Sequence, residues 1–177
     1  MTAKIILLTF SVLVICIMAA WYLAPKFLEQ PSYKIVQKAG NIKIRLYNSI
    51  LLKSVTVSGN QYQALRRGFR PLVTYIGAKK RDGDKISMTA PVMQMSGNTQ
   101  EDWIISFSMP SKYDASSLPA PNNEEVFTET VGPTKAAVIR FSGNADEKLL
   151  AKKTGQLSDW LKKAAFTAKS KPRYMFY

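Results

Sequence analysis

Apolar and polar residues alternate with a period of two in several short runs of the chain, which predicts half-buried β-strands. Two such runs, Tyr33 to Gln37 and Ile42 to Tyr47, flank a turn at Gly40-Asn41. Further strands are predicted at ILLKSVTV (50–57), WIISFSMP (103–110), KAAVIRF (135–141) and PRYMFY (172–177). The chain is therefore rich in short strands.

The run GDKISMTAPVMQM, Gly83 to Met95, is the least regular of the predicted strands. Apolar residues occupy alternate positions before Pro91, but the phase of the alternation slips after it. Because proline donates no ladder hydrogen bond and a slip in phase is typical of a bulge, we expect the strand to bend at Pro91. Met88, Met93 and Met95 give this segment a soft apolar character, which suggests that something is accommodated beside it.

Two longer segments carry apolar residues three or four positions apart, which predicts amphipathic helices. The first helix presents Tyr62, Leu65, Phe69, Leu72 and Ile76. We expect Pro71 to divide or bend this helix. The second helix presents Leu149, Leu150, Leu157, Trp160 and Leu161. Gly155 lies within this helix and lowers its helix propensity.

Both helices follow a similar tetrapeptide, VSGN ending at Asn60 and FSGN ending at Asn144. Gln63 and Glu147 lie three residues after these asparagines, so each helix is predicted to begin with a capping box. The repetition of strand, tetrapeptide and helix indicates two related half-domains. We therefore predict an α+β fold of two pseudo-repeats, with antiparallel strands packed under two helices.

The segment from Ile5 to Leu23 contains no charged residue. At about 1.5 Å per residue it is roughly as long as the hydrocarbon core of a bilayer. We expect residues 1–24 to form an uncleaved single-pass membrane anchor, followed by a linker at 25–32 and one domain at 33–177. A single N-terminal anchor of this kind predicts an extracytoplasmic domain, in the periplasm if the cell is bacterial.

A cleaved signal peptide is the alternative interpretation of this segment. Its apolar core would be unusually long, and the small-residue cleavage pattern is missing. Trp21 and Tyr22 follow Ala19 and Ala20, and these aromatic residues are typical of the membrane interface.

Composition narrows the possible chemistry. A net charge of +13 over 177 residues favours anionic partners, namely nucleic acid, lipid headgroups or ligands that carry carboxylates. The chain has no histidine and its only cysteine, Cys16, lies in the apolar N-terminal segment. These absences exclude a Ser-His-Asp triad, a Cys-His pair, an HExxH zinc site and histidine-ligated haem. Charge alone supports nucleic-acid binding, and no nucleic-acid-binding motif accompanies it.

The segment Ile86 to Val92, ISMTAPV, resembles the I-x-M-T-x-P-V signature of the SOUL haem-binding family. YKIVQKAGNIKIRLY, ALRRGFRPLVTYIGA, the FSMP and LPAP region and VIRFSG resemble other parts of the family in the same order. The resemblance covers Tyr33 to Tyr177. It implies a distorted, barrel-like antiparallel sheet with two long helices, related to the effector-binding domains of some transcription regulators. It also implies haem or another tetrapyrrole as ligand, held here in an apolar groove without histidine, for transient carriage or sensing.

A porphyrin is a flat apolar disc with two carboxylates, so its site needs aliphatic and methionine surface with cations at one edge. The resemblance also implies a binding role for Arg66, which matches a basic position on the first helix of some family members. The candidate ligand-binding residues are Tyr62, Leu65, Arg66, Phe69, Arg70, Met88, Met93 and Met95.

Simpler interpretations exist for the same residues. Core packing is the more favoured explanation of the methionines, and the apolar helix residues are most simply the buried face of that helix. Lys79, Lys80 and Arg81 would either meet propionates or form a solvated turn, which would also suit contact with anionic lipid. Asp82 and Asp84 form a D-G-D turn with too few oxygens for a metal site.

The main alternative function is a small-molecule effector-binding or lipid-surface module that binds no haem. An enzyme is less favoured, because the sequence contains no Ser-x-x-Lys pair and no phosphate-binding glycine loop. We expect no nucleic-acid partner and no metal site, and the sequence leaves the oligomeric state open.

Overall fold

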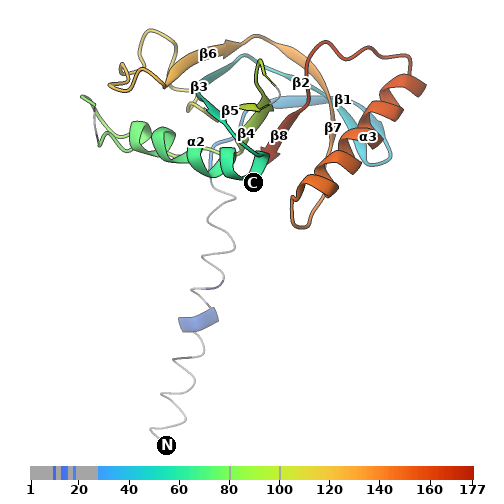
Figure 1. Ribbon diagram of the computed structural model, residues 1–177, viewed down its shortest axis with the longest axis horizontal. Coiled ribbons are helices and arrows are strands. Elements are labelled where there is room, and N and C mark those ends of the chain that lie inside the picture. The colour runs from blue at the N-terminus through green and yellow to red at the C-terminus, as the bar shows by residue number, and fades with distance from the viewer. Residues whose placement is uncertain (1–9, 11–12, 16–17, 19–27, 80, 100) are drawn as a thin grey trace, which may run out of the picture.

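The computed structural model describes residues 10, 13–15, 18, 28–79, 81–99 and 101–177. Two long helices, α2 (Gln61–Ile76) and α3 (Glu147–Lys163), accompany the strands of this part of the chain (Figure 1). The strands are β1 (Tyr33–Ala39), β2 (Ile42–Tyr47), β3 (Ile50–Ser58), β4 (Val92–Ser96), β5 (Asp102–Ser108), β6 (Phe127–Val131), β7 (Thr134–Ile139) and β8 (Arg173–Phe176).

The strands form two antiparallel sheets, which corrects the prediction of one barrel-like sheet. A three-stranded sheet has the order β1-β2-β7, and a five-stranded sheet has the order β6-β3-β5-β4-β8. The chain leaves the five-stranded sheet at Gly132-Pro133 and pairs next with β2, so no closed barrel forms in the described part of the chain. Both sheets occur with helices in one α+β fold, as predicted.

The predicted transmembrane helix is not borne out. Among the described residues, no helix has the length and apolar character needed to cross a bilayer. Most of the predicted span at 5–23 falls outside the described residues.

The segment at 86–91 is not a strand, which corrects the first half of the predicted irregular strand. Its backbone groups are bound by partners outside the sheet: the Ile86 amide donates to the Ile76 carbonyl, and the Ala90 amide donates to the Glu29 carbonyl. The Thr89 hydroxyl donates to the Ser108 carbonyl at 2.6 Å. Strand β4 therefore begins only after Pro91.

Helix α2 begins as predicted, because the Asn60 side chain accepts a hydrogen bond from the Gln63 amide at 2.9 Å. Pro71 does not divide it, since α2 continues to Ile76. Gly68 faces the sheet, and a Cβ atom there would lie 2.5 Å from Cγ1 of Ile105. Glycine thus allows α2 to approach β5 closely.

Helix α3 begins later than predicted. Its N-cap is Asp146, which accepts from the Leu149 amide at 2.8 Å, and Asn144 lies outside the helix. Helix α3 lies against β7, beside the three-stranded sheet (Figure 1).

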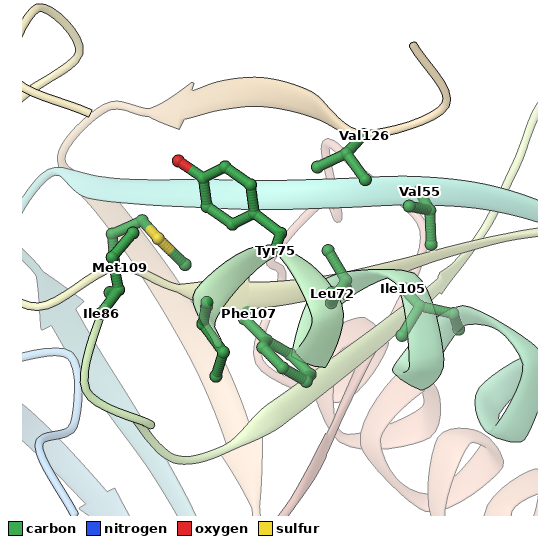
Figure 2. Packing of buried hydrophobic residues seen from close by; sticks show 9 residues of the cluster. Val55, Leu72, Tyr75, Ile86, Ile105, Phe107, Met109 and Val126 are labelled. Carbon is green, nitrogen blue, oxygen red and sulfur yellow. The ribbon is translucent and has the colours of Figure 1, made fainter. Parts of the chain in front are cut away.

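The five-stranded sheet has a hydrophobic cluster on each face. Between α2 and the sheet, Leu72 and Tyr75 pack on Val55, Ile105 and Phe107 (Figure 2). The second cluster lies on the opposite face and contains Tyr47, Ile50, Leu52 and Met93, with Val131, Ala136, Val138 and Met175 packed against it. Helix α2 is thereby held on one side of the sheet, and the three-stranded sheet contributes to the other.

Candidate functional site

A groove of about 330 Å³ lies along α2, at the ends of two neighbouring strands. Leu65, Arg66 and Phe69 line it from the helix, and Val92 and Phe176 line it from the sheet. Val92 is the first residue of β4 and Phe176 the last of β8, and the two are direct partners in the antiparallel register. The groove therefore has a helical wall and a cross-strand pair as its floor.

The lining of the groove is apolar except for one cation. Leu65 is half-buried and Phe69 is exposed along the groove. The Phe69 and Phe107 rings pack edge to face, with centroids 5.3 Å apart, while Phe69 stays 40% exposed. Exposed apolar surface of this kind is typical of a ligand-binding groove.

Arg66 supplies the positive charge of the groove. Its side chain is exposed, and its guanidinium carbon lies 5.9 Å from the centroid of the Tyr62 ring, one turn earlier on α2. Arg66 forms no ion pair with any residue that the structure describes. Its donors are available to an acidic group at the edge of the groove.

The other predicted ligand-binding residues lie in different places. Met93 is 1% exposed and belongs to the cluster on the opposite face of the sheet, and Met95 shares that face because it lies two residues further along β4. Met88 is half-buried against the cluster under α2. Tyr62 and Arg70 lie exposed on α2 but do not line the groove. The structure thus brings three of the eight residues together, Leu65, Arg66 and Phe69.

A model of the SOUL heme-binding protein family matches residues 28–177. The chain belongs to this family. No curated protein matches the chain.

Two solved structures are similar to this SOUL chain in fold. The C-terminal domain of EcmrR aligns with a TM-score of 0.58 and 11% identity, over 81% of this chain and 83% of that one. A hydrolase from Listeria innocua aligns with a TM-score of 0.52 and 9% identity, over 80% of this chain and 87% of that one. At these identities the likeness is one of fold alone.

Sequence reasoning missed the floor of the groove. Val92 and Phe176 both stand in predicted strands of the SOUL chain, but 84 positions separate them and only the β4–β8 pairing brings them together. Alternation along PRYMFY was the available signal, since it places Tyr174 and Phe176 on one face.

Arg81 is a structural residue of the SOUL chain, which corrects its interpretation as part of a solvated turn or a propionate contact. It is 8% exposed, and its guanidinium donates to the carbonyls of Tyr75, Asp82 and Asp84 at 2.6–2.7 Å. Of the neighbouring lysines, Lys79 is exposed and Lys80 lies outside the described residues. The arginine fork therefore fixes the D-G-D turn to the end of α2.

Lys53 is a second buried cation, which sequence reasoning did not identify because a lysine in a strand is normally expected to face solvent. It is 2% exposed, donates to the Thr128 hydroxyl at 2.7 Å, and lies 4.7 Å from the centroid of the Tyr75 ring. Burial lowers the pKa of Lys53, and the charge of Arg81 lowers it further. Burial also raises the pKa of Tyr75, whose hydroxyl donates to the Pro119 carbonyl.

The groove is lined by leucine, phenylalanine, valine and one arginine. None of these side chains is a usual ligand for a metal ion. The chain has no histidine, and no group of three histidine, cysteine, aspartate or glutamate side chains among the described residues could hold a metal. Any haem held there would gain its affinity from contacts with the ring and its carboxylates.

Proposed function

We propose that this SOUL chain binds haem or a related tetrapyrrole non-covalently in the α2 groove, without histidine ligation, for transient carriage or sensing. The observation that carries the proposal is an apolar groove with an arginine at its edge that forms no ion pair in the described part of the chain. A porphyrin needs both features, because its face is apolar and its propionates are anionic. Leu65, Phe69, Val92 and Phe176 would contact the ring, and Arg66 a propionate.

The size of the groove predicts modest affinity. A volume of about 330 Å³ is at the low end for ligand pockets, so much of the ring would stay in solvent. Covering about 200 Å² of porphyrin at about 25 cal/mol per Å² contributes about 5 kcal/mol, whereas a micromolar Kd requires about 8 kcal/mol. The charged contact must supply part of the difference. Loose binding of this kind suits carriage or sensing better than redox chemistry.

A binding role is also favoured over catalysis by the chemistry of the lining. Its side chains include no nucleophile and no acid–base pair. The fold-level likeness to a hydrolase leaves this proposal unchanged, because function depends on the site and not on the fold.

The test is a haem titration of the full chain, monitored by the Soret band. Arg66→Glu should weaken binding about tenfold, since a propionate contact becomes a repulsion. Arg67→Glu is the matched control: it makes the same charge change at the next position on α2, outside the groove lining, and should change affinity less than about threefold.

Two results would contradict the proposal. Equal weakening by both substitutions would show that only net charge attracts haem, and not a contact at Arg66. Absence of any Soret change with the folded chain would favour another flat apolar ligand, which is the effector-binding alternative.

A further inference from the structure

A second polar site lies on the three-stranded sheet, away from α2. Arg45 on β2 is surrounded by Tyr33 on β1, Tyr47 on β2 and Tyr177 directly after β8; we call these four residues the Arg45 cluster. Phe176 lines the α2 groove and Tyr177 follows it in the chain. The end of β8 therefore separates two distinct sites.

The geometry of the Arg45 cluster is that of an enclosed guanidinium. Arg45 is 6% exposed, and its Nη1 donates to the Tyr47 hydroxyl at 3.0 Å. Its guanidinium carbon lies 4.1 Å from the centroid of the Tyr33 ring, and the Tyr33 and Tyr47 rings are 5.3 Å apart. Burial raises the pKa of Tyr177, and the positive charge of Arg45 acts in the opposite direction by lowering it. Aromatic rings and a phenol thus surround the cation.

Among the described residues, no acidic side chain forms an ion pair with this guanidinium. All twelve acidic side chains lie among the described residues, and the ion pair that they form is Glu129 with Arg173, at 3.9 Å. The Nε atom of Arg45 is buried and has no hydrogen-bond partner among the residues that the structure describes. A buried charge without a counter-charge is unfavourable, so this arrangement resembles a site prepared for an anion.

We propose that the Arg45 cluster binds the carboxylate of a small organic acid, at a site separate from the tetrapyrrole groove. An arginine fork matches a carboxylate with two parallel hydrogen bonds, and the unpartnered Nε–H is one of the donors that such a contact uses. Ile35 is the register partner of Arg45 on β1, and Ile35 and Tyr33 are both partly exposed. They offer an apolar contact for the body of the acid beside its carboxylate.

The test uses benzoate as the probe ligand, and benzoate is added to the full chain in the absence of haem. Arginine Nε–H signals are resolved by ¹⁵N NMR, so the Arg45 signal reports directly on this site. Benzoate should shift it in a saturable manner, while benzamide, which has the same shape and no charge, should not. Arg45→Met should weaken benzoate binding at least tenfold. Arg173→Met removes an arginine that already has a carboxylate partner and should leave the affinity unchanged.

A purely structural role predicts different results. If Arg45 only joins the strands, benzoate will not move its signal, and that outcome overturns the proposal. Should Arg45→Met fail to fold, Tyr47→Phe removes a single hydroxyl beside Arg45 and should still weaken benzoate binding about threefold. Unchanged affinity in a folded Tyr47→Phe variant, together with an unmoved Arg45 signal, would also reject the site. Haem binding at Arg66 is measured separately, so either proposal can fail alone.

Discussion

Among the described residues, three cations are more than nine-tenths buried, and none of the three forms an ion pair with a carboxylate there. Lys53, Arg45 and Arg81 are 2%, 6% and 8% exposed, and each is stabilised by hydroxyls, carbonyls or aromatic rings. With 25 basic and 12 acidic side chains, the chain has too few anions to pair every cation. The three residues differ in how well their charge is satisfied, and so in what their removal should do.

Lys53→Met should stabilise the protein at pH 7, by about 1 kcal/mol, because it replaces a buried charge by an apolar chain of similar length. The gain should shrink as the pH rises. Burial lowers the pKa of Lys53 in the folded state, so between that lowered pKa and the ordinary 10.5 the unfolded chain binds more protons and the wild type gains stability with pH. Urea unfolding at a series of pH values measures both effects.

Thr128→Val is the control for the lost hydrogen bond, since it removes the acceptor of Lys53 and keeps the charge. A Lys53→Met variant that is less stable than the wild type at pH 7 would show that the contacts with Thr128 and Tyr75 outweigh the cost of burial.

Arg81→Met should destabilise the protein by about 2–4 kcal/mol, since three backbone carbonyls lose charged donors together. Lys79→Met, two positions earlier in an exposed place, should stay within about 0.5 kcal/mol of the wild type. Chemical unfolding of the two variants decides between the structural role and a solvated turn: equal, small effects would favour the turn.

At the scale of elements, local patterns predicted most of the strands and both helices. Alternation located β1, β2, β3, β5, β7 and β8, and spacing located α2 and α3. The failures have non-local causes. Residues 86–90 alternate like a strand, but their amides find partners in Glu29 and Ile76. Strand β6 was missed because its sequence, FTETV, follows a polar loop and is recognisable only by its pairing with β3.

The helix caps give a direct comparison of a confirmed prediction with a wrong one. Asn60→Ala and Asp146→Ala should each cost about 1 kcal/mol, because each removes the acceptor for a free amide of the first turn. Asn144→Ala should cost less than about 0.5 kcal/mol, because Asn144 does not cap α3. Thermal or urea unfolding of the three variants measures this; an Asn144→Ala effect as large as that of Asp146→Ala would restore the predicted cap.

At the scale of the whole molecule, the two sheets place the groove and the Arg45 cluster apart. Spacing in the sequence indicated the helical side of the groove, because Leu65 and Phe69 lie about one turn apart on α2 and Arg66 follows Leu65 directly. It could not predict the floor, which depends on the pairing of β4 with β8, or the direction in which the methionines point. Met93 and Met95 face away from α2 because the register pairs Val92 with Phe107, which lies under α2, and side chains alternate along β4.

The position of the methionines leads to a prediction about the metal. With no histidine in the chain and no sulfur in the groove lining, the affinity for a tetrapyrrole should come from the ring and its propionates. Metal-free porphyrin should therefore bind within about threefold of haem, as measured by competition or by fluorescence quenching. Met93→Leu and Met88→Leu, which keep the side-chain size, should leave both affinities unchanged. A preference for haem of tenfold or more, lost in one of these variants, would instead show that a thioether reaches the iron. Loss in Met93→Leu would place the ligand on the other face of β4, and loss in Met88→Leu would place it beside the cluster under α2.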